Sequence, residues 1–428
     1  MAASHINLIR NSKLYISTTN DTTAMKAANT YQLNVLDGFS FSQTTATAEI
    51  SLSEAGADAK RGKKSFNTSR NPVDWSFTTY IRPYKRTAGT TPVSHSSAVE
   101  KLMWESLLTA GQTVATPSNT SWTPFYTLEG TGSTGMTMNT LNSDKDILTT
   151  LYVFFELSDG SNKTYYRINK ALVNTAEIDF SIDGIAQIAW AGQGETLEEI
   201  TLSDMPPSTA GKVMPVHNGV GSTTLSGTHG VGLAGDSATQ KVFEPEYIRN
   251  KLSTVTLVDA NGGAKDGEFY QIILTGGSVS IDNGVTYLTP DELGVVNTPI
   301  GGFTGVRNIT GTMTTYLRSG GTGPDHDGST AAKGYDSATL ISDLLASTTS
   351  TSNEYVLNLN MGGAAAPMVN FKFNHANLEV PSIDVADVIS TTINFTAEGA
   401  SMTAADVMER SEERRVGKEC RSRWSPYH

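Results

Sequence analysis

Apolar and polar residues alternate in short runs along most of the chain. The segments 39–41, 73–77, 272–274 and 279–281 each place apolar side chains two positions apart. Because successive side chains of a β-strand point to opposite faces of a sheet, this period predicts strands with one face in a core and the other in water. Asp159-Gly160 and Asn283-Gly284 are typical of hairpin turns. The pattern therefore predicts a mainly β protein.

Two segments show helical spacing instead. In the first, Ser97 and Glu100 have the spacing of a capping box, which marks a helix start. In the second, Asp336 or Ser337 can cap the first turn. The apolar residues that follow recur on one helical face: Val99, Leu102, Met103 and Leu107 in the first segment, and Leu340, Ile341, Leu344 and Leu345 in the second. We expect one helix in each half of the chain.

The chain also repeats itself. Several short motifs return in the same order at nearly constant separation: IRN at 9–11 and 248–250, TTYIR at 78–82 and TTYLR at 314–318, NxA at 169–171 and 374–376, and ID at 178–179 and 383–384. Together they predict two tandem copies of one unit of ordinary domain size. Equivalent core positions are then expected to be Phe77 and Met313, Tyr80 and Tyr316, and Trp190 and Phe395. Each copy is α+β, mainly β, with one flanking helix.

These matches divide the chain into segments. Residues 1–200 form the first copy, with an insertion at about 111–165. Residues 201–245 form a linker and residues 246–409 the second copy. The last residues, 410–428, read RSEERRVGKECRSRWSPYH and resemble the translation of a sequencing-adapter oligonucleotide. We treat them as a non-native tail and expect them to be dispensable.

Composition narrows the classes of function. The formal net charge is −12, and the excluded tail contributes more basic than acidic residues. An acidic chain does not grip DNA by neutralising phosphates, although it can let DNA pass. The only cysteine, Cys420, lies in the tail, so disulfides and thiolate metal sites are not expected. No apolar run is long enough for a membrane helix, and the first residues lack a signal-peptide core. We therefore expect a protein that is made and kept in a cytoplasm until it assembles.

Motifs that could carry chemistry are weak. GxGxxG occurs at 130–135 and 230–235, but neither match opens a helix in a βαβ unit, so we predict no bound nucleotide. Asp325-His326-Asp327 lies in a glycine-rich segment and is interpreted as a solvated turn rather than a metal site. No nucleophile elbow, phosphate loop or zincin helix is present. We therefore predict no catalytic residue, metal or cofactor, and a protein that is not an enzyme.

Each copy contains a long segment between paired strands, which we interpret as an irregular loop. In the first copy it covers 44–71, and in the second copy 283–306. The two segments carry opposite charge: Lys60, Arg61, Lys63 and Lys64 in the first, and Asp291 and Glu292 in the second. Two solvated loops would show the same pattern. We predict instead that these charges mark surfaces that meet between molecules.

At this point the residues resemble a known family. IRNSKLYIST and VLDGFSFSQ near the start, NPVDWSFTTYIRP, and later GVTYLTPDELGVVNTPIGGFTG and TGTMTTYL are similar to tail tube (major tail) proteins of tailed bacteriophages. The resemblance covers residues 6–399. It implies a β-sandwich or barrel unit with a flanking helix. Six such units form a ring whose sheets join into a β-barrel around a channel, and the rings stack into a tube.

The resemblance carries further implications. The loops 44–71 and 283–306 would reach a neighbouring ring. Two units per chain would give a trimeric, pseudo-hexameric ring, whereas six chains per ring remain an alternative. The partners would be other copies of the chain, the tail terminator, baseplate and sheath proteins, and double-stranded DNA passing through the lumen without specific binding. The location would be the virion tail, and no membrane would be involved.

Other classes of protein remain open at this stage. A baseplate hub or an outer decoration protein could contain a similar duplicated β-rich unit. A carbohydrate-binding β-protein would also suit strands rich in Thr, Ser and Trp, and its hydrolytic version needs two acidic side chains across a cleft. Asp179 and Asp384 recur at matched positions, which favours shared architecture over a single cleft.

Overall fold

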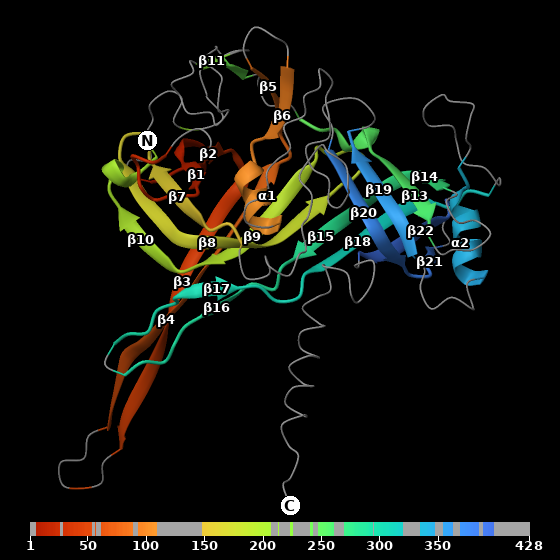
Figure 1. Ribbon diagram of the computed structural model, residues 1–428. Helices are drawn as coiled ribbons and strands as arrows, with labels where there is room; N and C mark the ends of the chain where they lie inside the picture. Colours follow the sequence, from red (N-terminus) through yellow and green to blue (C-terminus); the bar gives the residue numbers. More distant parts are fainter. Residues whose placement is uncertain are drawn as a thin grey trace, which may run out of the picture.

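Strands dominate the protein (Figure 1). The computed structural model describes residues 6–25, 29–53, 56, 61–88, 93–108, 148–206, 213, 223–225, 240–242, 247–260, 269–293, 295–319, 334–346, 354–362, 369–384 and 388–397. The two predicted GxGxxG matches, Asp325-His326-Asp327, and the tail 410–428 lie outside these residues.

Among the described residues, the first half of the chain contains ten strands and one α-helix. A 3-10 turn, η1 (Ile9–Asn11), precedes the first strand. The elements are β1 (Lys13–Ser17), β2 (Thr30–Leu33), β3 (Val35–Ser53), β4 (Arg61–Tyr80), β5 (Pro83–Ala88), β6 (Val93–Ala98), α1 (Lys101–Leu108), β7 (Leu151–Ser158), β8 (Lys163–Asp179), β9 (Gln187–Gly194) and β10 (Thr196–Ile200).

Short elements connect this half to the next. They are η3 (Leu202–Asp204), β11 (Thr223–Leu225), β12 (Gln240–Val242) and η5 (Asn250–Leu252). The second half contains β13 (Thr254–Asp259), β14 (Phe269–Ile272), β15 (Leu274–Asp282), β16 (Thr286–Leu288), β17 (Gly301–Phe303), β18 (Asn308–Tyr316), α2 (Ser337–Ala346), β19 (Glu354–Met361), β20 (Val369–Leu378), β21 (Ser382–Asp384) and β22 (Ser390–Ala397).

Both predicted helices are present, but only one predicted cap is correct. Asp336 accepts a hydrogen bond from the backbone N–H of Thr339 at 2.9 Å, so it caps α2 as expected. Ser97 instead lies in strand β6. The carboxylate of Glu100 accepts the backbone N–H of Arg82 at 2.9 Å. The predicted capping box is therefore wrong, because the Glu100 carboxylate binds the buried backbone N–H of Arg82, just after β4.

The strands of the two halves pair in the same order. The first half runs β2-β1-β7-β8-β9-β4-β3. The second half runs β14-β13-β19-β20-β22-β18-β15. In each series the helix follows the fourth of these strands in the sequence. Residues 151–158, predicted to belong to an insertion, form β7, which occupies the place that β19 has in the second series.

One strand pair joins the two series. Strand β15 pairs with β18 on one edge and with β8 on the other. The result is one antiparallel sheet in the order β3-β4-β9-β8-β15-β18-β22, with β21 beside β22. We call it the joined sheet. No closed barrel forms among the described residues, so the barrel form of the predicted unit is not found within one chain.

Strand β8 bends and belongs to two layers. Its first part pairs with β7 and β10, and its second part with β9 and β15. A bulge lies between them, and Lys170 there has a φ of 46°. The bend folds the β7 layer back over β3, where the Phe41 and Phe155 rings stack with centroids 4.3 Å apart. This gives the first half a sandwich-like core.

The core shows a reciprocal exchange between the halves. Trp75 of β4 lies opposite Gly192 of β9, whereas Gly311 of β18 lies opposite Phe395 of β22. A Cβ atom added to Gly192 would sit 2.4 Å from the Trp75 ring, and one added to Gly311 would sit 2.3 Å from the Phe395 ring. Each pair therefore combines one aromatic ring with one glycine. In the first half the ring is on β4, whereas in the second half the glycine is on the corresponding strand, β18.

The strand register corrects two predicted equivalences. Phe77 lies opposite Trp190, but Met313 lies opposite Ile393. Ile393, rather than Phe395, thus takes the position that corresponds to Trp190. The IRN triplets also differ in place, because η1 begins at Ile9 whereas η5 begins at the Asn of its triplet.

Candidate channel and stacking surfaces

One face of the joined sheet is apolar and the other is polar. The apolar positions of β4, β9 and β18 are buried in the main core, which also holds Trp104 of α1; its ring lies 5.1 Å from that of Trp190. The alternate positions form what we call the open face: Ser40, Ser42, Asp74, Ser76, Thr78, Thr175, Glu177, Asp179, Ala189, Ala191, Ser278, Ser280, Asp282, Thr310, Thr312, Thr314, Thr392, Asn394 and Thr396. The period of two seen in the sequence produces this division.

Hydroxyl groups hydrogen-bond to one another across the open face. Ser40 and Ser76 lie 2.9 Å apart on β3 and β4. Ser278 and Thr312 lie 3.1 Å apart on β15 and β18. Such cross-strand pairs stabilise a sheet while leaving its surface wettable.

The charges of the open face all have the same sign. Its ionisable residues are Asp74, Glu177, Asp179 and Asp282, and the positions that define it include neither Lys nor Arg. Gln193, at an edge of β9, donates a hydrogen bond to Asp74 at 3.0 Å. The face therefore offers hydroxyls and carboxylates, and no basic group that would hold a phosphate.

The segment 44–71, predicted to be an irregular loop, is a two-stranded hairpin. Strands β3 and β4 continue their antiparallel register out to Ser53 and Arg61. Figure 1 shows the hairpin as a long arm that extends well beyond the rest of the protein. Its β-propensity comes from Thr45, Thr47, Ile50, Phe66 and Thr68. We call this hairpin the arm.

The arm separates the predicted basic residues onto two sides. Neighbouring residues of a strand point to opposite faces, so Lys63 and Lys64 diverge. Lys63 forms an ion pair with Glu49 of the facing strand. Lys64 lies opposite Ile50 on the other side, where Phe66 is also exposed. The predicted cluster is therefore not a single patch.

The second segment lies along the arm. Asn297 accepts the backbone N–H of Arg70 at 2.8 Å and donates its own N–H to Thr68 at 3.2 Å. Figure 1 shows the 283–306 segment, with β16 and β17, running beside the arm. Its tip exposes apolar side chains: Leu293, Val295, Val296 and Ile300. Such a group of exposed apolar residues marks an interaction surface.

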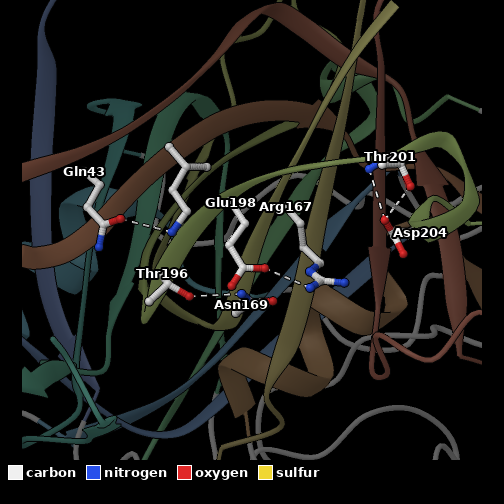
Figure 2. Close-up of polar contacts among 8 residues, drawn as sticks. Gln43, Arg167, Asn169, Thr196, Glu198, Thr201 and Asp204 are labelled. Atoms are coloured by element: carbon white, nitrogen blue, oxygen red, sulfur yellow. Dashed lines mark hydrogen bonds and ion pairs between the residues drawn. The ribbon is translucent and has the colours of Figure 1, made fainter.

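Strand β10 ties the root of the arm to the body of the protein. Gln43 accepts the backbone N–H of Leu197 at 3.1 Å and donates to the carbonyls of Asn71 and Glu195. Figure 2 shows Gln43 beside β10, with Thr196 bound to Asn169, and Glu198 paired with Arg167 at 2.9 Å. These bonds fix the direction in which the arm leaves the sheet.

A turn completes this region. Asp204 accepts hydrogen bonds from both the backbone N–H and the hydroxyl of Thr201 (Figure 2). These bonds lower the pKa of Asp204, the side-chain bond contributing most. The carboxylate therefore holds the end of β10 in place at neutral pH.

Comparison with known proteins identifies a relative of this chain. No family model matches the chain. The chain is 28% identical to the tail tube protein pb6 of Escherichia phage T5 over 409 residues, which cover 94% of this chain and 74% of the relative. The chain is a relative of a phage tail tube protein. The predicted resemblance to that family is confirmed, and with it the assignment to a structural protein of the virion tail.

The described residues among the predicted ring-stacking set lie on the arm and on the 283–306 segment beside it. Asp291 and Glu292 are exposed on the 283–306 segment, beside the arm of the same chain. Arg61 begins β4, and Lys60 lies outside the described residues. Sequence reasoning missed the exposed apolar tip, although Leu293-x-Val295-Val296 between two prolines was a usable signal.

The described part of the tail tube relative contains no helix that is long and apolar enough to cross a membrane. Within the same residues, no group of three His, Cys, Asp or Glu side chains lies close enough to hold a metal ion.

Proposed function

We propose that three copies of this chain close into a pseudo-sixfold ring, and that rings stack into a tube that conducts double-stranded DNA. The observation that carries the proposal is the joined sheet, in which two series of strands with one order share a single polar face. Closing such a sheet on itself removes its exposed edges, which otherwise invite aggregation.

A duplicated unit accounts for the topology. Beyond the shared strand order, both series carry a bulge at the same place: between Leu151 and Val153 in the β7–β8 pair, and between Tyr355 and Leu357 in the β19–β20 pair. The reciprocal ring-and-glycine pairs fill the same core volume in opposite ways. Bulges and volume-matched pairs at the same positions support descent from one unit.

Both series contribute to the proposed channel wall, which favours three chains over six. The joined sheet includes four strands from each half, and each half supplies hydroxyl-bearing residues to the open face. If six chains formed the ring, one half would lie outside the wall and would need no such face. Head-to-tail contacts of this kind close into rings when the rotation permits.

The open face suits the lumen. Its carboxylates repel the DNA backbone weakly over the Debye length, about 10 Å at 0.1 M salt. Its hydroxyl groups remain hydrated, and no base is read. DNA therefore slides without binding, and the protein acts as a structural and non-enzymatic conduit.

The arm and the 283–306 segment form the proposed stacking surface. The exposed Leu293, Val295 and Val296 would be buried against the next ring, with Lys60, Arg61, Lys63, Lys64, Asp291 and Glu292 around them. Burial of an apolar side chain contributes about 1.5–3 kcal/mol, whereas an exposed ion pair contributes roughly 0–1 kcal/mol. The tail terminator, baseplate and sheath proteins would meet the same surface at the ends and outside of the tube.

Electron microscopy of the purified protein tests the function. We expect rings or tubes with a central channel, and a ring mass equal to three chains. A ring of six chains would overturn the stoichiometry, and a protein that stays monomeric under all assembly conditions would overturn the tube itself.

A further inference from the structure

The joined sheet ends in two strands that each have a free edge. Within the described residues, β3 pairs only with β4, and β21 pairs only with β22. The corresponding strands in the middle of the sheet have partners on both sides, because β15 pairs with β18 and with β8. The β8–β15 pair is therefore an internal junction. Strands that correspond to its two members, β21 to β8 and β3 to β15, lie unpaired at the two edges of the joined sheet.

Strand register identifies which residues correspond. Thr79 lies opposite Ile188, which lies opposite Ile178; in the second series Thr315 lies opposite Thr391, which lies opposite Ile383. Ile383 thus corresponds to Ile178.

The same counting applies at the other edge. Trp75 lies opposite Phe41, and Gly311 lies opposite Val279. Phe41 thus corresponds to Val279. Since Val279 and Ile178 lie opposite each other in the internal junction, Phe41 and Ile383 are the matching pair at the free edges.

Burial shows that the free edges lack a partner that the internal junction has. Ile178 and Val279 are each 0% exposed, whereas Ile383 is 48% exposed. Ala186, which follows the β8–β9 turn, is 0% exposed, and its counterpart Ile389 is 38% exposed. Large apolar side chains at these positions gain free energy only when another chain covers them.

A second contact in the junction has an exposed counterpart too. The segment before β13 packs on the β8–β9 turn: Ala186 donates its N–H to the carbonyl of Ile248 at 2.9 Å, and Tyr247 lies under the Arg82 guanidinium at 4.7 Å. Arg318 corresponds to Arg82 in the repeated motif and is exposed. In the segment before β1, by contrast, Ile6 is 59% and Ile9 is 52% exposed, so these side chains are not covered in the way that Ile248 is.

We infer that β3 of one chain pairs antiparallel with β21 of the next chain, in the register of the β8–β15 junction. This places Phe41 opposite Ile383, Ser42 opposite Ser382, and Ser40 opposite Asp384 of the neighbour. The segment before β1 then covers Val388 and Ile389 of the same neighbour. Pro381, which lacks an N–H, ends the pairing beyond Ser382 and explains why this edge is short. The inference rests on the proposed ring and specifies its seam.

Engineered disulfides test the register. Residues directly opposite in an antiparallel pair have Cα atoms about 4.5–5.5 Å apart, within the range for a disulfide. We would replace Cys420 by Ser and introduce S42C and S382C. Both serines are exposed; Ser42 belongs to the open face, and Ser382 lies opposite Thr392 of that face. Oxidised rings, run on a non-reducing gel, should give a ladder that ends at the covalently closed ring, expected at three chains.

Two matched controls bracket this result. The pair E177C with S280C occupies the internal junction, where the register is known, and should cross-link within one chain and give only a monomer band. The pair S42C with I383C shifts the register by one residue, which turns the two side chains to opposite faces. It should give little or no ladder.

The outcomes separate the seam from the ring. Microscopy that shows tubes, together with no ladder from S42C and S382C, overturns the register and leaves the tube standing. If the unmodified protein forms neither rings nor tubes, both proposals fall.

An independent variant covers the case in which cysteines disturb the edge. I383D should abolish ring assembly while the monomer unfolds at an unchanged temperature, and L345D, at an equally exposed position on α2, should assemble normally. Normal rings from I383D would overturn the seam.

Discussion

The two halves of the chain build the same series of strands but treat one hairpin differently. In the first half, β3 and β4 continue as paired strands from the sheet to the tip of a long arm. In the second half, β15 ends at Asp282 and β18 begins at Asn308, and the chain between them folds back over the base of that arm. The same series of strands thus carries a projecting hairpin in the first half, and in the second half the 283–306 segment, which hydrogen-bonds to that hairpin.

Local sequence explains the difference. The described residues of the arm contain no proline, and Pro72 lies just beyond them at the root of the arm. The 283–306 segment contains Pro290, Pro299 and five glycines. Proline removes a ladder hydrogen bond and glycine weakens a strand, so pairing within this segment is limited to the three residues each of β16 and β17. Under the proposed function, ring formation depends on the shared sheet, and stacking depends on the segments that the two halves do not share.

Removing the arm should have the largest effect. Replacing residues 48–66 by an Asn-Gly turn keeps the β3–β4 register, because the flanking residues Thr47 and Asn67 lie opposite each other. The sheet and core remain, so we expect single rings of normal mass and a nearly unchanged melting temperature, but no tubes in electron micrographs at any salt concentration. Tubes of normal length from this variant would show that the arm has no part in stacking.

Charge reversal on the arm should give the next largest effect. Changing Lys60, Arg61, Lys63 and Lys64 to Glu should leave the fold intact and block tube growth at low salt, as measured by light scattering. Because exposed charges are screened by salt, growth should recover in part at 1 M salt, where the Debye length is about 3 Å. K251E, an exposed charge away from the arm, is the control and should assemble normally.

The reciprocal ring-and-glycine pairs predict unequal costs for one added methyl group. In G192A the new Cβ would lie 2.1 Å from the Leu172 carbonyl oxygen, which is backbone and cannot move aside. In G311A the new Cβ would lie 2.3 Å from the far edge of the Phe395 ring, which can tilt, and 2.6 Å from the Ser278 carbonyl oxygen, so its clash with backbone is less severe than in G192A. Overpacking costs about 1–3 kcal/mol, so we expect both variants to lose stability in denaturant unfolding, with G192A losing more.

A glycine in open space controls for the change in backbone entropy. A Cβ atom on Gly301 would meet nothing within 4 Å, so G301A should unfold at the same denaturant concentration as the unmodified protein. Equal destabilisation by G192A and G311A would contradict the prediction that the backbone clash at Gly192 costs more than the ring clash at Gly311.

The smallest expected effect concerns the two helices. Glu105 of α1 has a raised pKa because burial penalises its charge, and the ion pair with Lys101 at 3.3 Å opposes that shift only in part. A raised folded-state pKa means that the contribution of Glu105 to stability is full below its unfolded pKa and is lost as the pH rises through the folded value.

Relative to E105Q, the unmodified protein should therefore gain stability as the pH falls from 7 toward 4, as followed by thermal unfolding. A difference between the two proteins that does not change with pH would contradict the assignment. S342A, at the matching position of α2, should show no such pH dependence.

Much of the fold could be predicted from local pattern. The alternation at 73–77 and 279–281 predicted strands with one buried face, and α1 and α2 lie where the helical spacing indicated. Periodicity is a property of neighbouring residues, so a single sequence contains it. The same holds for the family resemblance, since the ordered motifs that suggested it span nearly the whole chain.

Other features were decided only by tertiary structure. Nothing local distinguishes Ile178 from Ile383, yet one is buried and the other exposed, because β15 happens to lie beside the first. The sequence predicts an irregular loop at 44–71, whereas the structure shows a hairpin held by its backbone ladder and contacted by the 283–306 segment. Sequence fixes which side chains share a face, but pairing between distant strands depends on what the rest of the chain brings to each edge.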